Sequence, residues 1–192
     1  DNTSRAAAMT ETRTAILRAA FDLTAERLGP EIVLADVATR AGTTVKTVLR
    51  HFGSREALFD AVIDFATGEI ADERSAPVGD IDAAIAAVHA HYERRADWVL
   101  RMLGQEHSDT RISDIVESGR RVHREWVQAT FAPQLAAIGA DWRAASVDLL
   151  VVATDIYTWK ILRRDIGLTA AETAGRVRVL VTAVLLDTLE RN

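Results

Sequence analysis

The sequence contains no cysteine, and its 192 residues include only three prolines. Without cysteine the chain has no disulfide, no thiolate metal site and no cysteine nucleophile. No run of apolar residues approaches the roughly 18–20 residues that a membrane-spanning helix requires, so we expect no membrane partner. The first residues show no signal-peptide pattern, and we therefore expect a cytoplasmic protein. Because Asp1 is not an initiator residue, the sequence leaves the true N-terminus open.

Patterns for common enzyme and metal chemistry are also missing. The sequence has no Gly-rich phosphate loop, no Glu-x-x-His pair of the kind used in di-iron bundles, and no nucleophile elbow around a serine. His89 and His91 are two residues apart on an expected helix, and this spacing directs them to different faces. We therefore expect no catalytic residues, no metal and no cofactor, in a protein that is not an enzyme.

The charge balance is acidic, with 23 Lys and Arg against 28 Asp and Glu and a formal net charge of -5. The acidic excess lies after residue 60, because residues 1–60 hold eight basic and eight acidic residues. Within them, Arg40, Lys46, Arg50 and Arg55 follow one another with no acid between them. A short basic patch on an acidic chain is typical of a small DNA contact surface, although an ordinary solvated face has the same composition.

Helical periodicity dominates the sequence, and strand-type alternation with hairpin turns is missing. We expect an all-α fold of about nine helices in total. The expected helices cover Thr10–Leu28 (ended by Gly29-Pro30), Leu34–Ala41, Thr44–His51, a stretch beginning after Ser54, Asp80–Leu103, Ile112–Glu117, Arg120–Ile138 (kinked or split at Pro133), Asp141–Asp165 and Thr169–Leu189. The segment Ser75–Gly79 contains Pro77 and is the expected domain boundary.

These helices predict an N-terminal domain over residues 1–55, a connecting helix over 56–75 and a C-terminal domain over 76–192. Residues 147–162 are apolar almost all round the expected helix, and the last helix is apolar on more than one face. Such surplus apolar surface predicts a homodimer, although a central position inside a monomer would also cover it. The expected dimer interface consists of Val147, Val151, Val177, Leu180 and Val184.

Residues 34–52, with the sequence LADVATRAGTTVKTVLRHF, have the pattern of a helix-turn-helix. Val37 and Ala38 face the joint between the two short helices, Gly42 lies in the turn, and Val48 and Phe52 hold the second helix from behind. The opposite face would offer Thr44, Val45, Lys46, Thr47 and Arg50 to the major groove of DNA. An ordinary helical hairpin has the same spacing, and the pattern alone does not separate the two.

The same residues resemble a known family. The run Asp36–Ala38, Ala41–Thr44 and Thr47–Leu58 is similar to the DNA-binding domain of TetR-family transcriptional regulators, and the resemblance covers residues 11–65. The later segment Tyr157–Leu168 resembles the C-terminal part of many members. The resemblance implies an N-terminal three-helix DNA-binding domain with a helix-turn-helix, followed by a C-terminal helical bundle for ligand binding and dimerisation.

In function, the resemblance implies a ligand-responsive DNA-binding transcriptional regulator. It would be a repressor that a small-molecule effector releases from a palindromic double-stranded DNA operator. The alternative is a helical ligand-binding or scaffold protein of the same fold that has lost DNA binding.

The resemblance also assigns site residues. DNA contacts are implied for Thr43, Thr44, Val45, Lys46, Thr47, Leu49, Arg50, His51 and Arg55. Two positions depart from the family: Leu49 stands where a tyrosine is usual, and Val33 stands where Ser or Thr opens the first helix of the motif. Both departures remove polar contacts, so we expect weak or unusual DNA binding in which Lys46 and Arg50 carry a larger share.

The aromatic side chains of the C-terminal domain are the candidates for an effector pocket. The candidate pocket residues are the aromatic side chains Tyr92, Trp98, Trp126, Tyr157 and Trp159, together with Met102 and Asp155. Each aromatic side chain would fit an ordinary helical core equally well. Asp155 lies in an apolar stretch and therefore needs a partner, either inside the bundle or in the ligand.

Overall fold

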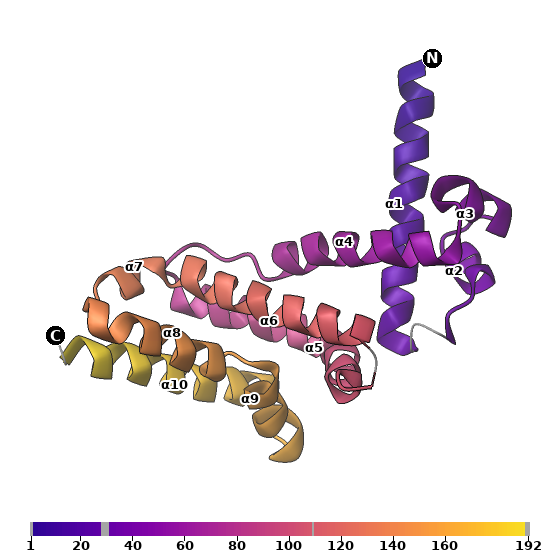
Figure 1. Cartoon of the computed structure of the whole chain (residues 1–192). Coiled ribbons are helices and arrows are strands. Elements are labelled where there is room, and N and C mark those ends of the chain that lie inside the picture. Colours follow the sequence, from indigo (N-terminus) through magenta and orange to yellow (C-terminus); the bar gives the residue numbers. More distant parts are fainter. Residues whose placement is uncertain (1, 28–30, 109, 191–192) are drawn as a thin grey trace. The chain divides into compact units, whose positions relative to one another are not determined.

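The computed structural model describes residues 2–27, 31–108 and 110–190, and no strand occurs in these ranges, so the predicted all-α fold is confirmed. The chain divides into two compact units, Asp1–Ala71 and Asp72–Asn192 (Figure 1). The division falls near the end of one helix, in the stretch predicted to connect the two domains. That helix therefore contributes residues to both units.

The first unit contains three helices and most of a fourth. They are α1 (Asn2–Glu26), α2 (Leu34–Arg40), α3 (Val45–Phe52) and α4 (Arg55–Glu73). The first helix begins well before the predicted Thr10, because Ala6, Ala7 and Ala8 favour helix and extend it toward the N-terminus. The Gly29-Pro30 pair that was expected to end this helix lies outside the described residues.

Every helix of the first unit contributes to one apolar core. Phe21 of α1, Val37 of α2, Val48 of α3 and Leu58 of α4 are at most 1% exposed. Because α2 and α3 are short, their positions depend on these buried contacts rather than on helix propensity. The core therefore fixes the helix-turn-helix from behind.

The second unit is built around two long helices, α5 (Ile81–Gln105) and α6 (Thr110–Thr130). After them follow α7 (Ala132–Ala136), α8 (Ala140–Ala153), α9 (Ile156–Lys160), a π-helical turn η2 (Ile161–Asp165) and α10 (Ala170–Glu190). Their main core joins α5, α6, α7, α8 and α10. A smaller cluster surrounds Tyr92 of α5 and Trp159 of α9.

Two predicted boundaries in this unit were wrong. The stretch 110–130 is one continuous helix, because Gly119 is exposed and interrupts neither the backbone nor the packed face. The helix expected over Asp141–Asp165 is broken at Thr154, where the Asp155 side chain accepts a 2.8 Å hydrogen bond from the Tyr157 amide and starts α9. The apolar residues run through this break, so periodicity gave no sign of it.

Several predicted helix ends are confirmed. The carboxylate of Asp80 accepts a 2.9 Å hydrogen bond from the Ala83 amide at the start of α5. Thr169 and Glu172 form the predicted capping box before α10, with the Glu172 carboxylate accepting from the Thr169 amide at 2.9 Å. Pro133 splits the helix expected over Arg120–Ile138 by occupying the first turn of α7.

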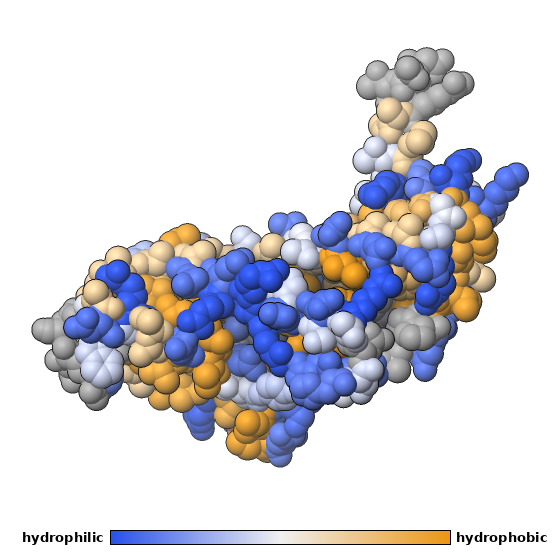
Figure 2. Space-filling model, viewed as in Figure 1, coloured by the Kyte–Doolittle hydropathy of each residue, from blue (hydrophilic) through white to orange (hydrophobic). Residues whose placement is uncertain are grey.

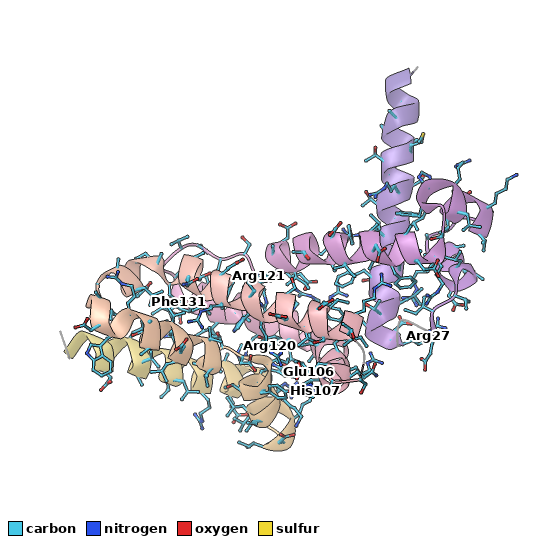
Figure 3. All side chains as sticks on the ribbon, viewed as in Figure 1. Arg27, Glu106, His107, Arg120, Arg121 and Phe131 are labelled. Carbon is cyan, nitrogen blue, oxygen red and sulfur yellow. The ribbon has the colours of Figure 1, made fainter. Side chains whose placement is uncertain are left out.

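The connection between α5 and α6 is held by charge. The Glu106 carboxylate, directly after α5, lies 2.7 Å from the Arg120 guanidinium of α6, and His107 projects beside it (Figure 3). At the other end of α6, Phe131 is fully buried in the main core. Among the described residues, no helix is both long and apolar enough to cross a membrane.

Candidate nucleic-acid interface and buried polar cluster

The predicted helix-turn-helix is present in the first unit. Helices α2 and α3 pack against each other, with Val37, Ala38 and Val48 buried between them and the core. The turn contains Gly42 with a φ of +65°, a left-handed conformation that glycine adopts without strain. These contacts cover one side of α3 and leave its opposite side open.

The open side of α3 carries most of the residues predicted to contact bases. Val45 and Leu49 are 36% and 40% exposed, and the Lys46 and Arg50 side chains are also exposed. Thr44 has a structural role here, because its hydroxyl oxygen accepts a 3.2 Å hydrogen bond from the Thr47 amide and caps the helix. The cap fixes the first turn of α3, the part that reaches base edges in helix-turn-helix proteins.

The four cations of the basic patch fall into two groups, those whose side chains have partners within the protein and those without an ion pair. Arg40 forms a bidentate ion pair with Glu26, and the Arg55 Nε donates to the Ile32 carbonyl while its guanidinium lies 4.7 Å from the Phe59 ring centroid. Lys46 and Arg50, in contrast, form no ion pair within the described part of the chain. The uncompensated positive charge therefore lies on the open side of α3.

The remaining predicted contacts are less open. Thr43 and Thr47 are half-buried, and the Thr43 amide is used in the turn, where it donates to the Ala38 carbonyl at 2.9 Å. His51 is also half-buried, and its Nε2 is covered and has no hydrogen-bond partner among the described residues. Beside it, the Ser54 hydroxyl caps α4 by accepting from the Ala57 amide at 3.1 Å.

Both departures from the family pattern are visible in the geometry. Val33 precedes α2 and forms no side-chain cap, while its apolar side chain is exposed. Leu49 places an apolar side chain on the open face of α3. The surface that would meet a phosphate backbone therefore has fewer hydrogen-bond donors than the family pattern provides.

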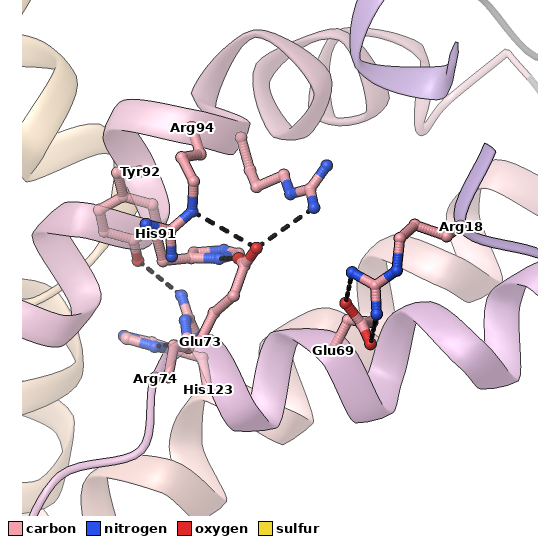
Figure 4. A network of polar contacts seen from close by, with 9 residues as sticks. Arg18, Glu69, Glu73, Arg74, His91, Tyr92, Arg94 and His123 are labelled. Carbon is pink, nitrogen blue, oxygen red and sulfur yellow. Dashed lines mark hydrogen bonds and ion pairs between the residues drawn. The ribbon is translucent and has the colours of Figure 1, made fainter. Parts of the chain in front are cut away.

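The second unit contains a buried polar cluster that the sequence did not reveal. The Arg74 guanidinium donates to the Tyr92 hydroxyl at 3.0 Å and lies 3.3 Å from the Nδ1 of His123 (Figure 4). Tyr92 in turn donates to the Thr154 carbonyl at 3.0 Å, and the Nε2 of His123 lies 3.2 Å from the Thr154 hydroxyl. The cluster thus links the residue after α4 to α5, α6 and the break between α8 and α9.

Burial keeps the neighbours of Arg74 uncharged. Burial and the charge of Arg74 lower the pKa of His123 to about 3, so its ring is neutral near pH 7. Burial also raises the pKa of Tyr92 to about 12. A neutral His123 accepts from Arg74 at Nδ1, and its Nε2–H then donates to Thr154, an assignment that follows from the hydrogen-bond network.

A second group of charged residues lies at the end of α4. The Glu73 carboxylate lies 2.6 Å from the Nδ1 of His91 and 3.4 Å from the Nε of Arg94 (Figure 4). It also lies 3.2 Å from the guanidinium of Arg95. Burial alone would raise the pKa of Glu73, but the His91 hydrogen bond and the Arg95 charge lower it to about 2. Burial lowers the pKa of His91, so the ring is neutral and donates its Nδ1 proton to the carboxylate.

The structure separates the predicted pocket residues into two sets. Tyr92, Trp126 and Trp159 pack in one aromatic cluster, and Asp155 begins the helix that carries Trp159. Tyr157 is 50% exposed and is not among the described residues that form this cluster. Trp98 and Met102 of α5 are half-buried but are not among the described residues that form the aromatic cluster. Their neighbours Val99, Leu100 and Leu103 pack against that cluster.

Sequence reasoning missed the polar members of this cluster, Arg74, His123 and Thr154. Arg74 lies in the short segment after α4 and belongs to no periodic pattern. A weak signal existed on α6, because His123 and Trp126 are three residues apart and their rings stack with centroids 5.7 Å apart.

The predicted dimer residues do not share one environment. Val147 and Val177 are buried in the main core of the protomer, whereas Val151 and Val184 are half-buried and Leu180 is 44% exposed. Other apolar side chains of α8 and α10 are open, namely Leu149, Val152, Val179 and Leu186. In the region of these helices Figure 2 shows extensive hydrophobic surface.

The described residues contain no group of three or more His, Asp or Glu side chains arranged to hold a metal ion.

Comparison with known proteins agrees with this geometry. Residues 16–62 match the family model described as bacterial regulatory proteins, tetR family. This segment begins in α1, contains all of α2 and α3, and ends in α4. It therefore covers the core and the open helix described above. No curated protein matches the sequence.

Solved structures extend the similarity to most of the chain. A tetR-family transcriptional regulator from Streptomyces coelicolor is 17% identical, with a TM-score of 0.69, over 95% of this chain and 84% of its own. GusR of Salmonella enterica is 21% identical, with a TM-score of 0.65, over 91% of this chain and 95% of its own. A Rhodococcus sp. protein assigned as a TetR-family transcriptional regulator is 15% identical, with a TM-score of 0.66, over 92% of this chain and 99% of its own. The chain is therefore similar to bacterial regulatory proteins of the tetR family over residues 16–62, and over most of its length it shares the fold of these solved structures.

Proposed function

We propose that this protein is a ligand-responsive transcriptional repressor that binds DNA as a homodimer. The observation that carries the proposal is the open side of α3, where Lys46 and Arg50 have no ion-pair partner among the described residues, while Val48 is buried behind them. An α-helix fixed in this way fits the major groove of B-DNA. Phosphate contacts by the two cations would set the register, and Thr44 and Val45 would lie closest to the bases.

The operator is double-stranded DNA with two related half-sites. A two-fold symmetric dimer presents one recognition helix per subunit, so its operator is palindromic, with half-sites about 34–36 Å apart or a multiple of this distance. The dimer interface proposed here consists of the apolar side chains that α8 and α10 leave open, including Leu180, Leu149 and Val152. Val147 and Val177 support these helices from the protomer core.

A small-molecule effector would act through the second unit. The aromatic and polar cluster around Tyr92, Trp126 and Trp159 is the proposed site, because pockets for small molecules combine apolar walls with a few fixed polar groups. An effector that favours one arrangement of the subunits lowers DNA affinity, and by linkage DNA lowers effector affinity equally.

The test is fluorescence anisotropy with a labelled duplex taken from the region upstream of the protein's own gene, over a range of salt concentrations. The double variant Lys46→Ala/Arg50→Ala removes four cations from a dimer. Because each phosphate contact contributes about 0.9 to the salt slope, we expect the slope to fall by up to about 4 and binding to weaken steeply.

The matched control is Arg121→Ala/Arg124→Ala, which removes two exposed cations from α6 in the second unit and should leave DNA affinity unchanged. Equal affinity of both double variants and the wild type would refute the assigned face. Absence of any salt-sensitive binding by the wild type would favour the alternative, a ligand-binding or scaffold protein of the same fold. The polar contacts missing at Val33 and Leu49 are the specific observation in its favour.

A further inference from the structure

Arg74 is a buried cation that forms no ion pair within the described part of the chain. The residue is 7% exposed, and its guanidinium donates to the Tyr92 hydroxyl and contacts the His123 ring, both neutral groups. Among the described residues, its Nε is covered and has no hydrogen-bond partner, and no salt bridge joins Arg74 to a carboxylate, although its charge acts on the Asp155 carboxyl. Buried charges in folded proteins are paired, because an unpaired ion loses its hydration without compensation.

The carboxylates in the same part of the fold are already used. Glu73, the preceding residue, binds His91 and Arg95. The Asp155 carboxylate accepts a hydrogen bond from the Tyr157 amide at the start of α9; burial raises the pKa of this carboxyl, and the charge of Arg74 acts in the opposite direction without an ion pair. The positive charge of Arg74 is therefore held by aromatic faces, with the guanidinium carbon 5.3 Å from the Tyr92 ring centroid and 5.8 Å from that of Trp126.

A second buried donor in the same cluster also lacks an acceptor. The Nε1 of Trp159 is covered and has no partner among the described residues, although Trp159 is only 2% exposed. Its ring packs beside Tyr92, with centroids 6.0 Å apart. One aromatic cluster thus contains two unused N–H donors, one of them cationic, and both require an acceptor.

We propose that the effector is an organic carboxylate with an apolar body, and that its carboxylate binds Arg74. This inference rests on the proposed function and specifies the chemistry of its effector. A carboxylate supplies acceptors only, carries the missing negative charge and matches the planar guanidinium. The apolar body would contact Trp126, Tyr92 and Trp159.

The surroundings favour a single negative charge rather than a phosphate. Arg74 is the one buried cation in contact with this cluster among the described residues, and the nearby His123 stays neutral. A doubly charged group would leave one charge uncompensated in an apolar environment. Arg74 also follows directly after α4, which begins three residues after the end of α3, so an anion bound here would act on the helix that contributes residues to both units.

Isothermal titration calorimetry with matched probes tests the proposal. The probes are hexanoate, phenylacetate and indole-3-acetate, each compared with its uncharged amide. We expect at least one carboxylate to bind the wild type about tenfold or more tightly than its amide, as one charge-assisted hydrogen bond provides. This comparison uses the wild-type chain and does not depend on the folding of any variant.

Arg74→Met keeps most of the apolar stem and removes the charge, and it should abolish the preference for the carboxylate over the amide. Arg124→Met, which removes an exposed cation of α6, should keep it. Equal binding of acid and amide, no binding of any of the three carboxylates, or full carboxylate binding by Arg74→Met would each overturn the proposal. Anisotropy with DNA in the absence of carboxylates tests the proposed function separately, so the two failures are distinguishable.

Discussion

Replacement of Glu73 by glutamine should destabilise the second unit strongly, and the loss should depend on pH. The contacts with His91 and Arg95 outweigh burial and lower the pKa of Glu73 from its ordinary value of 4.5 to about 2. The carboxylate is only 15% exposed, so solvent screens it little. At about 1.4 kcal/mol per pKa unit, its ionised form contributes about 3 kcal/mol to the free energy of unfolding.

The direction of the pH dependence follows from the lowered pKa of Glu73 in the folded state. The stabilisation is complete above the unfolded pKa of 4.5, and it is lost as pH falls toward the folded pKa of about 2. Urea denaturation followed by circular dichroism should therefore show Glu73→Gln about 3 kcal/mol less stable than the wild type at pH 7, and about half of that difference near pH 3.

The control is Glu69→Gln, one turn earlier on α4. Glu69 pairs with Arg18, whose side chain is 54% exposed (Figure 4), and such surface pairs contribute at most about 1 kcal/mol. A loss below about 1 kcal/mol for Glu73→Gln at pH 7, or a loss that does not shrink as the pH is lowered, would refute this reasoning. A ¹³C titration of the Glu73 carboxyl measures its pKa directly.

Three further substitutions test other parts of the molecule. Leu49→Tyr restores a phenol on the open side of α3 and should tighten DNA binding about two- to tenfold in anisotropy titrations, the effect of one added hydrogen bond; unchanged affinity would show that this position does not meet the DNA backbone. Leu180→Asp places a charge on the proposed dimer interface and should give monomers in analytical ultracentrifugation, whereas Ile166→Asp, at an exposed residue outside α8 and α10, should stay dimeric. Val48→Ala leaves a cavity behind α3 and should lower the free energy of unfolding of the first unit by about 2 kcal/mol in thermal denaturation, whereas Val45→Ala, on the open side, should change stability by less than about 0.5 kcal/mol.

The first unit was largely predictable because its signals are local. Val37, Ala38 and Val48 follow helical spacing, and Gly42 marks the turn between the two helices. In the structure the three apolar residues are buried, and Gly42 adopts the positive φ of a turn. The same patterns identified the caps at Asp80 and Thr169, since a cap requires only residues within one turn.

The second unit was harder because its polar cluster is assembled from distant residues. Arg74, Tyr92, His123 and Thr154 come from four separate segments, and no short pattern links them. The break at Asp155 was missed for a related reason. Apolar residues continue from α8 into α9, so the hydrophobic pattern predicted that this stretch is buried but did not predict where the helix is interrupted.

The neutral histidines have one consequence for how such a sensor would operate. Burial lowers the pKa of His123 to about 3, that of His89 to about 4 and that of His91 below its usual range, while Tyr92 keeps its proton up to about pH 12. His123, His89 and Tyr92 therefore keep the same charge throughout the neutral range. Mild acidification would leave these three groups unaltered, and the guanidinium beside His123 and Tyr92 would respond to the arrival of an anion rather than to their protonation.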